Sequence, residues 1–553
     1  MESSWNFVFN YADTTGILSL LRDIALSLVS IVFPDEKLTG IEERKEIAKE
    51  CEELFQEVVS LLQRAHSKDQ RIEFLPRDFW SKHGKEISLS RRTLKSRRIE
   101  RSNGRRGRGY SGMNHQPSFL QQFIETLSGS ESDSDDEIER VERVARMNPS
   151  DRRTMTIMRC IPFVIPFIHR VGMLKELIVE DKESQRTQID VSVRRTHLYE
   201  DAFVDLSLEN ARSLRPPLRV SMKNWIGMEE AGIDGGGIFR EFLTEVIKEA
   251  LDVSRGLFTE TNDHLLYPNP LAPLIMDNYR VHYFFIGRLL GKAIYEGQLL
   301  DVRLADFFLS RLFSNNKIDV DLVQMKGVDP IVYNNLVQLR LMDTSKVESL
   351  DLDFSVLVDE MGRTRKVDLI PNGSNIRVNG TNRDEYIQKY VNFFLHERLS
   401  EMVECLRNGV SDVVETRWLA IFSARELALL VSGEEGDIDI DDLKRNTVIH
   451  LPRSSDEDSI SRYIDSFWSV IRSFSSSERR LFIKFVTGCP RPPLGGFSTL
   501  HPSIGIQLVS SSDRLPSSAT CMNLLKLPLY SDKSILEDRL RYSINAGAGF
   551  ELS

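Results

Sequence analysis

A polar, highly charged stretch in the first third of the chain sets the strongest limit on how it can fold. The segment Ser88–Tyr110 reads SLSRRTLKSRRIERSNGRRGRGY, and the segment Ser128–Val144 reads SGSESDSDDEIERVERV. Neither supplies enough apolar side chains to offset the entropy that a chain loses on ordering. Their opposite charges are typical of a solvated, self-screening linker, and the serines among the acids could also accept phosphate. We therefore predict a disordered linker over residues 88–150, with folded parts before and after it.

The segment before this linker has the apolar spacing of helices. Apolar residues recur every three or four positions between residues 12 and 67, as one face of an α-helix requires. They are Ile17, Leu20, Leu21, Ile24 and Leu28 in a first group and Ile47, Cys51, Leu54, Phe55, Val58 and Leu62 in a second. Pro34 separates the two groups, because proline interrupts a helix. The pattern predicts a helical region over residues 1–87, as a helical hairpin or part of a helical solenoid.

Composition narrows the classes of function. The net charge of −10 disfavours a surface built throughout for phosphate backbones, so nucleic acid is not an expected partner. The five cysteines form no CxxC pair and no dense framework, so neither a metal site nor a disulfide scaffold is expected. The most apolar N-terminal segment, 17–33, contains Arg22 and Asp23 and is expected to be too short and too charged to cross a membrane. These features favour a protein of the cytoplasm, the nucleus or both.

After the linker the chain becomes steadily apolar. Residues 151–192 are predicted to form a helical lead-in, with breaks at Pro162 and Pro166. From Val191 to Ser553 no stretch is as polar as the linker, and a hydrophobic content of 41% supports sizeable cores. This part is expected to form one domain or two closely joined ones.

Cys521 follows a run of small residues, Ser517–Thr520, which leave its sulfur uncrowded. An alternating apolar stretch, Ile504–Leu508, precedes it and a helical pattern follows it, so a loop or strand edge is expected. Ser534 and Glu537 are predicted to form a capping box for the following helix. A free thiol with a pKa near 8.5 is a few per cent thiolate at neutral pH, which suffices for thioester exchange. On this local sequence alone, an inert structural thiol is the commoner interpretation.

Several ordered segments of the chain resemble those of HECT-type ubiquitin ligases. Cys521 lies in LPSSATCMNLLKLP, which is similar to the active-site stretch of that family. The other segments are EEAGIDGGGIFREFL (229–243), LLYPNP (265–270), FFIGRLLGKAIYEGQLLDV (284–302) and FIKFVTGCPRPPLGGF (482–497). Together these matches cover residues 193–553. TCMNLLKLP and the terminal AGFELS most resemble the branch of the family that includes ubiquitin-protein ligase E three C and its plant relatives.

The resemblance implies an α+β fold with a larger, mainly helical N-lobe and a smaller α/β C-lobe. We expect the N-lobe at 193–447 and the C-lobe at 460–553. The hinge is expected at 448–459, where HLPRSSDEDS is polar and contains proline. The resemblance further implies that Cys521 accepts ubiquitin as a thioester from a ubiquitin-conjugating enzyme and passes it to substrate lysines, without a cofactor or metal. Degradation of the substrates by the proteasome is the expected outcome.

The resemblance also implies roles for residues away from the thiol. Phe550, fourth from the end, matches an aromatic residue that family members use to position the lobes for transfer. Tyr386 and Tyr390 align with aromatic residues of the groove that binds the conjugating enzyme, and such anchors carry most of the energy of an interface. Leu336 and Leu339 are candidates for the opposite wall of that groove. For these four residues, ordinary core packing is the alternative.

Other classes of function stay open at this point. Ala519 stands where many family members carry a histidine, so backbone donors, solvent or the other lobe must activate the thiol. A cysteine hydrolase is disfavoured, because the nearest candidate base, His501, is distant in sequence. A ubiquitin-pathway scaffold that has lost transfer is disfavoured by the intact Thr520, Cys521 and Phe550. An RNA-binding protein acting through Arg91–Arg108 would lack aromatic residues for stacking.

Overall fold

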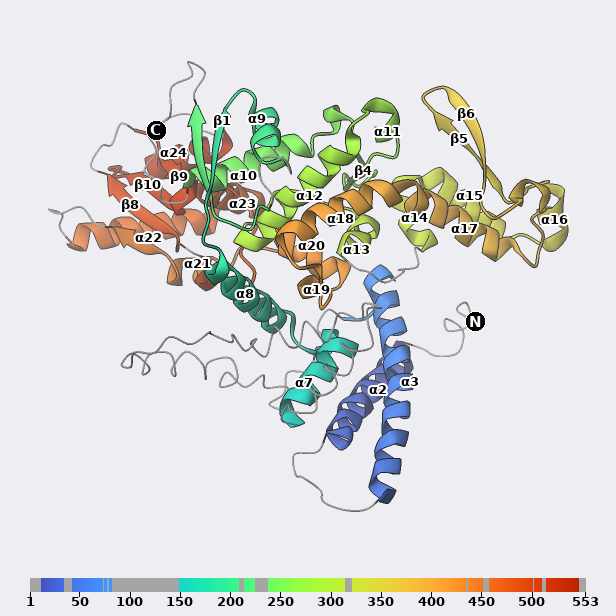
Figure 1. Ribbon diagram of the computed structural model, residues 1–553. Helices are drawn as coiled ribbons and strands as arrows, with labels where there is room; N and C mark the ends of the chain where they lie inside the picture. The colour runs from blue at the N-terminus through green and yellow to red at the C-terminus, as the bar shows by residue number, and fades with distance from the viewer. Residues whose placement is uncertain are drawn as a thin grey trace, which may run out of the picture. The chain divides into compact units, whose positions relative to one another are not determined.

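The computed structural model describes residues 11–33, 42–72, 74–76, 79–81, 149–207, 213–223, 237–313, 321–433, 436–450, 457–500, 502–509 and 514–546. They belong to two compact units, the first comprising residues 1–181 and 416–423 and the second 182–415 and 424–553. Helices predominate and short strands accompany them, which confirms the predicted α+β class (Figure 1). Nearly all of the linker predicted over 88–150 lies outside the described residues.

Helices form the first unit. Its first two, α2 (Tyr11–Val32) and α3 (Glu42–Ile72), pack against each other as the apolar spacing predicted. The side chains that they bury are Leu18, Ala25, Leu28 and Val29 from α2 and Phe55, Val58, Val59 and Leu62 from α3. Three further elements follow: α7 (Pro149–Cys160), the 3-10 helix η3 (Pro162–Val164) and α8 (Phe167–Ser184). Pro162 and Pro166 fall at the two breaks, as predicted.

A buried carboxylate holds the chain that follows α3. Asp69 is 7% exposed and accepts hydrogen bonds from Leu75 N at 2.9 Å and from Trp80 Nε1 at 2.8 Å. One turn earlier, the ring of His66 stacks on Phe163 with centroids 4.0 Å apart, and Trp80 packs edge-on against both rings. A buried carboxylate is stable only when its oxygens are hydrogen-bonded, so Asp69 fixes this part of the first unit.

A short segment from far along the chain completes the first unit. It comprises α19 (Thr416–Leu419) and the residues up to Ser423. Arg170 of α8 is 2% exposed and donates to Ile165 O at 2.9 Å and Ile421 O at 2.8 Å. Its guanidinium also lies over the ring of Phe422, 5.5 Å from the centroid. A single buried arginine therefore joins α8 to this segment.

Helix α2 is long and apolar enough to cross a membrane by length and composition. The segment Asp13–Val32 has a mean hydropathy of 1.7, and 22% of it is buried. The expectation that the apolar segment 17–33 is too short and too charged to cross a membrane is therefore not met by this longer helix. Core helices of soluble proteins pass the same test, and α2 packs on α3. The absence of a membrane partner stays a prediction.

Two helices packed through glycines form the centre of the N-lobe, a name used from here for residues 182–415 and 424–433. They are α12 (Tyr279–Glu296) and α18 (Ser400–Val413). A Cβ on Gly287 would lie 2.1 Å from Leu406 O, and a Cβ on Gly409 would lie 2.0 Å from Phe284 O. Only glycine allows two backbones to approach this closely. The glycines therefore set the distance between the two helices.

Short elements surround this helix pair. Strand β1 (Ile189–Arg194) pairs in parallel with β2 (Leu218–Lys223), so the N-lobe begins before the predicted residue 193. The others are α9 (Leu198–Asp205), α10 (Gly237–Ala250), η4 (Val253–Arg255), β3 (Phe258–Glu260), β4 (Leu266–Pro268), α11 (Ala272–Ile275), α13 (Asp306–Phe313), η6 (Glu397–Leu399) and α20 (Ala424–Ser432).

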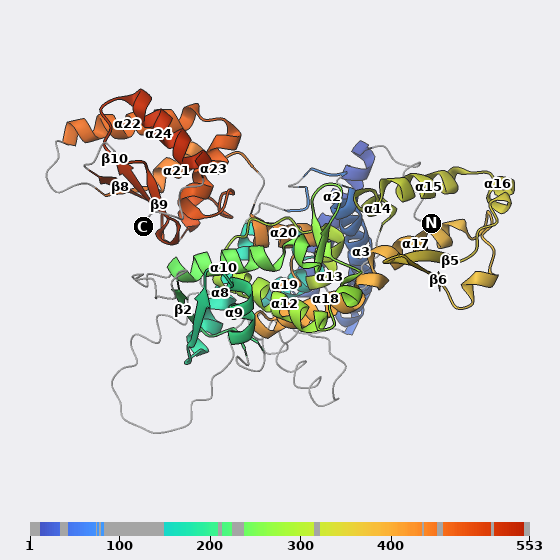
Figure 2. The same ribbon diagram turned by 90° about the horizontal axis from the view of Figure 1, so that it is seen from above.

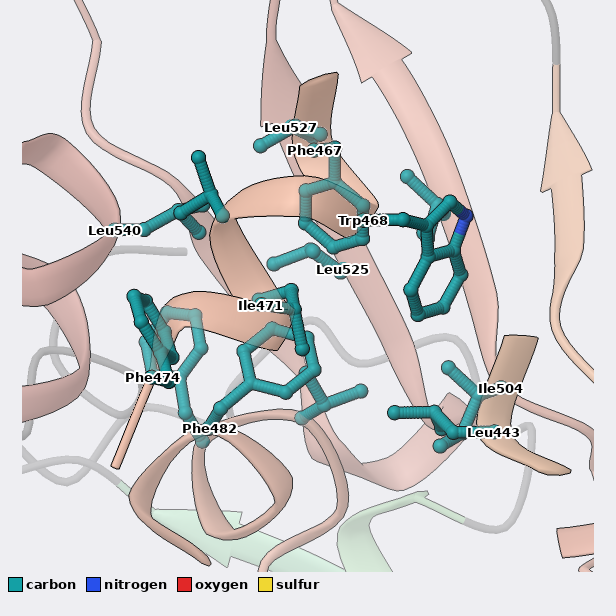
Figure 3. Packing of buried hydrophobic residues seen from close by; sticks show 14 of the residues in the cluster. Leu443, Phe467, Trp468, Ile471, Phe474, Phe482, Ile504, Leu525, Leu527 and Leu540 are labelled. Carbon is teal, nitrogen blue, oxygen red and sulfur yellow. The ribbon is translucent and has the colours of Figure 1, made fainter. Parts of the chain in front are cut away.

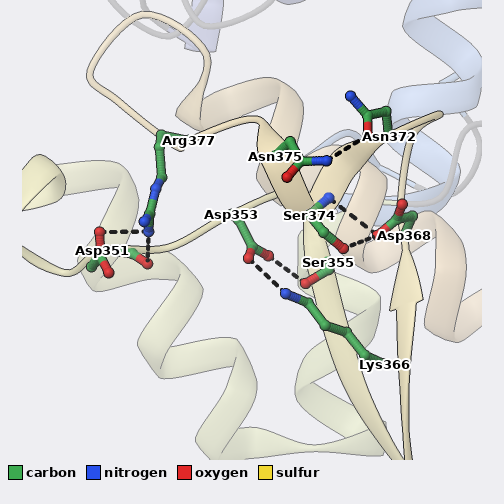
Figure 4. A network of polar contacts seen from close by, with 9 residues as sticks. All are labelled: Asp351, Asp353, Ser355, Lys366, Asp368, Asn372, Ser374, Asn375 and Arg377. Carbon is green, nitrogen blue, oxygen red and sulfur yellow. Dashed lines mark hydrogen bonds and ion pairs between the residues drawn. The ribbon is translucent and has the colours of Figure 1, made fainter.

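A smaller group of elements inserts between α13 and α18. It consists of α14 (Leu322–Val328), α15 (Pro330–Leu341), α16 (Thr344–Ser349), β5 (Ser355–Glu360), β6 (Arg363–Asp368), η5 (Gly373–Asn375) and α17 (Arg383–Leu395). Figure 4 shows the polar contacts around its β-hairpin. Asp353 accepts from Lys366 at 2.9 Å and from Ser355, and Asp368 accepts from Ser374 N at 3.1 Å. These contacts fix the hairpin to the connection that leads to α17.

The C-lobe, used from here for residues 436–553, has a hydrophobic core of its own. Four strands form a sheet in the order β7 (Val448–His450), β8 (Gly505–Val509), β10 (Leu524–Pro528) and β9 (Ser517–Ala519). Helices α21 (Ile440–Arg445), α22 (Glu457–Ser473), α23 (Ser476–Thr487) and α24 (Lys533–Ala546) and the short η7 (Phe497–Thr499) accompany it (Figure 2). Phe467, Ile471, Leu525 and Leu527 are 0% exposed at the centre of this core (Figure 3).

The predicted boundary between the lobes is wrong. Val448–His450 is a strand that pairs in parallel with β8, and so belongs to the C-lobe sheet and not to a hinge over 448–459. Ile438 and Leu443 are buried in the C-lobe core, although the N-lobe was predicted to run to 447. The chain therefore passes from one lobe to the other between Gly433 and Ile438. The elements on either side of the polar stretch, β7 and α22, both belong to the C-lobe.

Candidate active site

Cys521 lies in a tight turn between two strands of the C-lobe sheet. The turn is the 3-10 helix η8 (Thr520–Met522), which joins β9 to β10. The two strands are antiparallel, with Ala519 opposite Leu524. Strand pairing on both sides limits the freedom of the turn, so the backbone of Cys521 has a defined place at the edge of the sheet. The predicted position on a loop or strand edge is confirmed.

Asn523 holds this turn in shape, a role that no local sequence pattern predicted. It is 1% exposed and has a left-handed backbone with φ of 48°, which asparagine tolerates better than most residues. Its side-chain Nδ2 donates to Pro502 O at 2.6 Å, and its backbone N donates to Thr520 O at 3.2 Å. Its carbonyl accepts from Gly505 N at 2.9 Å. The residue that closes the turn is thus bonded to both neighbouring segments.

The residues around Cys521 leave the turn partly open. Ser517, Ser518 and Thr520 are half-buried, and Met522 is 44% exposed. Helix α23 lies against η8, and a Cβ on Gly488 at its end would be 3.9 Å from Thr520 Cβ. The predicted capping box at Ser534 is wrong, because α24 begins at Lys533 and the carboxylate of Asp532 accepts from Ser534 N.

Burial disfavours the thiolate form of three other cysteines. The pKa values of Cys160, Cys405 and Cys489 are all raised above the usual value for a thiol, in each case mainly by burial. A raised pKa lowers the fraction of thiolate, which is the nucleophilic form. Cys51 is half-buried on α3, in the first unit.

Three of the four residues predicted to line a groove for a conjugating enzyme lie in the core. Leu336, Leu339 and Tyr386 are 5%, 4% and 6% exposed, and burial raises the pKa of Tyr386 to about 12. Side chains this buried stabilise α15 and α17, as the core-packing alternative expects, and their place in a groove stays a prediction. Tyr390 is half-buried, stacks on Phe394 with centroids 4.8 Å apart, and is the one of the four left at the surface.

Two other expectations concern Phe550 and metal binding. Phe550 lies outside the described residues, so its role stays a prediction. Within the described residues, no group of three or more His, Cys, Asp or Glu side chains is placed to hold a metal ion.

Comparison with known proteins assigns this part of the chain to a family. Residues 244–553 match the family model of the HECT domain, described as a ubiquitin-transferase. This match covers more than half of the chain, from α10 to the end, and includes η8. The chain therefore belongs to the HECT family.

Individual relatives extend the similarity beyond this domain. The chain is 37% identical to the E3 ubiquitin-protein ligase etc-1 of Caenorhabditis elegans, over 98% of this chain and 56% of that protein. It is 38% identical to the E3 ubiquitin-protein ligase UPL6 of Arabidopsis thaliana, over 72% and 39%. It is 35% identical to the human ubiquitin-protein ligase E3B, over 73% and 41%. The chain spans about half the length of the curated relatives that it matches.

Proposed function

We propose that this chain is a ubiquitin transferase that carries ubiquitin as a thioester on Cys521 and passes it to lysines of substrate proteins. The observation that carries the proposal is the position of Cys521 in η8, inside a HECT domain and in a turn that its neighbours hold in place. The names of the relatives, all ubiquitin-protein ligases, support the same activity.

The proposed chemistry has two steps, each an acyl transfer. In the first, the Cys521 thiolate attacks the carbonyl of the thioester that joins ubiquitin to a conjugating enzyme, and the thiol of that enzyme leaves. In the second, a substrate lysine amine attacks the new thioester, an amide bond forms, and the Cys521 thiol leaves. The first step exchanges one thioester for another and is nearly isoenergetic, whereas amide formation draws the sequence forward.

The other cysteines of the HECT domain are poor alternatives. Cys405 lies in α18 and Cys489 is 8% exposed, and burial raises the pKa of both thiols. Burial that raises the pKa of a thiol lowers its thiolate fraction and restricts access to it, and the first step needs both a thiolate and access for a protein partner.

Docking of the conjugating enzyme is proposed on the surface of α15 and α17. Tyr390 is the remaining aromatic candidate from the sequence. Ile331 and Leu341 of α15, which packs on α17, are 72% and 79% exposed, and exposed apolar side chains are typical of binding surfaces. Phe550 is proposed to position the lobes for the second step. Proteasomal degradation of the products and a cytoplasmic or nuclear location complete the proposal.

The test is an adduct assay on a nonreducing gel. The chain is mixed with activating enzyme, a conjugating enzyme, ubiquitin and ATP. We expect a ubiquitin adduct that disappears on addition of thiol, is absent from Cys521→Ala and persists in the control Cys405→Ala. An adduct that survives in Cys521→Ala would overturn the assignment.

A further inference from the structure

A glycine at the end of α20 lies between the two lobes. Gly433 has a left-handed backbone with φ of 79°. A Cβ placed on it would lie 3.1 Å from Leu299 Cδ1 of the N-lobe, 3.2 Å from Arg491 Cβ and 3.4 Å from Pro492 O of the C-lobe. The first two distances are tighter than ordinary contacts, and the third is an ordinary contact. Gly433, the last described residue before the C-lobe, therefore packs against the N-lobe on one side and against the C-lobe on the other.

An arginine of the C-lobe is bonded to the backbone at the same point. Arg491 Nη1 donates to Ser432 O at 2.8 Å. Ser432 is itself 7% exposed, and its hydroxyl donates to Val302 O at 2.6 Å. One residue earlier, Val431 O accepts from Leu300 N at 2.8 Å. The carbonyl that receives Arg491 thus belongs to a backbone fixed inside the N-lobe.

An ion pair joins the lobes nearby. Lys484 Nζ of α23 lies 2.8 Å from Asp301 Oδ2, which follows the N-lobe residues bonded to α20. Both side chains are partly exposed, 50% for Lys484 and 37% for Asp301. An exposed pair of this kind contributes about 1.5- to 5-fold to an equilibrium and is weakened by salt. The ion pair therefore contributes more to the orientation of the two lobes than to the strength of their contact.

The same arrangement brings the active-site turn against the N-lobe. Helix α10 lies against η8, in addition to the contact that α23 makes with η8 inside the C-lobe. One side of the turn that carries Cys521 is thus closed by α10. A conjugating enzyme must therefore approach Cys521 from a side of the turn that α10 does not cover.

We propose that Asp301, Ser432 and Gly433 form a seat on the N-lobe, that Lys484 and Arg491 hold the C-lobe on it, and that Arg491 and Gly433 are positioning residues for transfer to lysine. The proposal rests on the proposed thioester route. Loading of Cys521 requires the C-lobe to leave the seat, and discharge to lysine occurs with the C-lobe on it.

The strength of the contacts fits a reversible seat. One hydrogen bond from a charged group and one exposed ion pair together shift an equilibrium by about 20- to 800-fold. A ligand or a reaction step can move a two-state equilibrium of this size. The positive φ of Gly433 adds a steric limit, because any side chain there strains the backbone and separates Leu299 from Arg491.

The test compares the two steps in single turnovers. Loading is measured as transfer from a ubiquitin-charged conjugating enzyme to the chain, and discharge as loss of that adduct to free lysine. For Arg491→Ala and Gly433→Val, we expect the ratio of discharge to loading to fall at least about 5-fold. The control Arg539→Ala, at an exposed residue of α24, should leave the ratio unchanged. A purely structural role would slow both steps by the same factor, and that result would overturn the proposal.

Charge exchange supplies a second variant that does not depend on correct folding of Gly433→Val. Lys484→Asp and Asp301→Lys should each lower the ratio, and the double variant should restore it. If both single variants lower the ratio and the double variant lowers it further, the proposed ion pair is wrong.

A measurement without catalysis separates this proposal from the proposed function. In hydrogen exchange, Arg491→Ala should raise exchange in residues 299–302 and 429–433 while β8 and β10 stay protected. If the wild-type chain forms no adduct, the thioester route fails, and the exchange pattern still decides whether the seat exists. Unchanged exchange in both N-lobe segments would overturn the seat.

Discussion

Replacing Gly287 with alanine tests the central packing of the N-lobe. The added Cβ would lie 2.1 Å from Leu406 O and 3.0 Å from Leu406 Cα, both in the backbone of the facing helix. Backbone atoms cannot rotate away as a side chain can, so α12 and α18 must separate by roughly 1 Å along their shared length.

The magnitude follows from two opposing terms. Overpacking of this kind costs about 3 kcal/mol, at the upper end of the usual range, because the clash is with backbone. Alanine gains about 1 kcal/mol over glycine inside a helix. The free energy of unfolding should therefore fall by about 2 kcal/mol, which raises exchange through unfolding about 30-fold.

Hydrogen exchange of the peptides covering α12 and α18 is the assay. The matched control is Gly327→Ala in α14, where the nearest atom to an added Cβ is Asp263 Oδ2 at 3.5 Å, an ordinary contact. That variant should be neutral or stabilised by up to about 1 kcal/mol. If Gly287→Ala is as well protected as Gly327→Ala, the close approach of the two helices is wrong.

Three further predictions concern other parts of the chain. Asp69→Ala should lower the free energy of unfolding of the first unit by about 2–3 kcal/mol, since it leaves two buried donors unpaired; a change below 0.5 kcal/mol in urea unfolding, roughly the size of a surface effect, would refute this. Asp201 bonds to Arg194, which lowers its pKa to about 2, so it stabilises the fold above pH 4 and this contribution is lost as pH falls toward 2. Between pH 4 and pH 2, the unfolding midpoint of Asp201→Asn should therefore fall less than that of the wild type. If both midpoints fall equally with pH, the pairing of Asp201 with Arg194 is refuted. Tyr390→Ala should weaken binding of a conjugating enzyme at least 5-fold, roughly the threshold of an interface anchor, with little loss of stability. In contrast, Tyr386→Ala should lower stability. If titration shows that Tyr386→Ala weakens binding and thermal unfolding shows that Tyr390→Ala lowers stability, the roles assigned to the two tyrosines are refuted.

Local patterns predicted the elements well where one physical rule acts on a few neighbouring residues. The breaks at Pro162 and Pro166 follow from proline geometry, and the helices α2 and α3 follow from apolar spacing. The turn that holds Cys521 followed from an alternating stretch before it and a helical pattern after it.

Predictions failed where distant residues decide the outcome. Leu336 and Tyr386 have the same apolar pattern whether they line a groove or a core, and only the packing of α14, α15 and α17 distinguishes the two. The hinge was placed at a polar segment, but pairing of Val448–His450 with β8 assigns that segment to the C-lobe. Gly433 gave no local signal, because its role depends on Arg491 from the other lobe.

The most direct test of the account is the chemical nature of the bond at Cys521. Cys521→Ser should trap ubiquitin as an oxygen ester that resists thiol and is cleaved by hydroxide. Mass spectrometry of the digested adduct should then find the C-terminal ubiquitin remnant at position 521. Modification at another residue, or no adduct in Cys521→Ser while the wild-type chain ubiquitinates lysine, would contradict the thioester route.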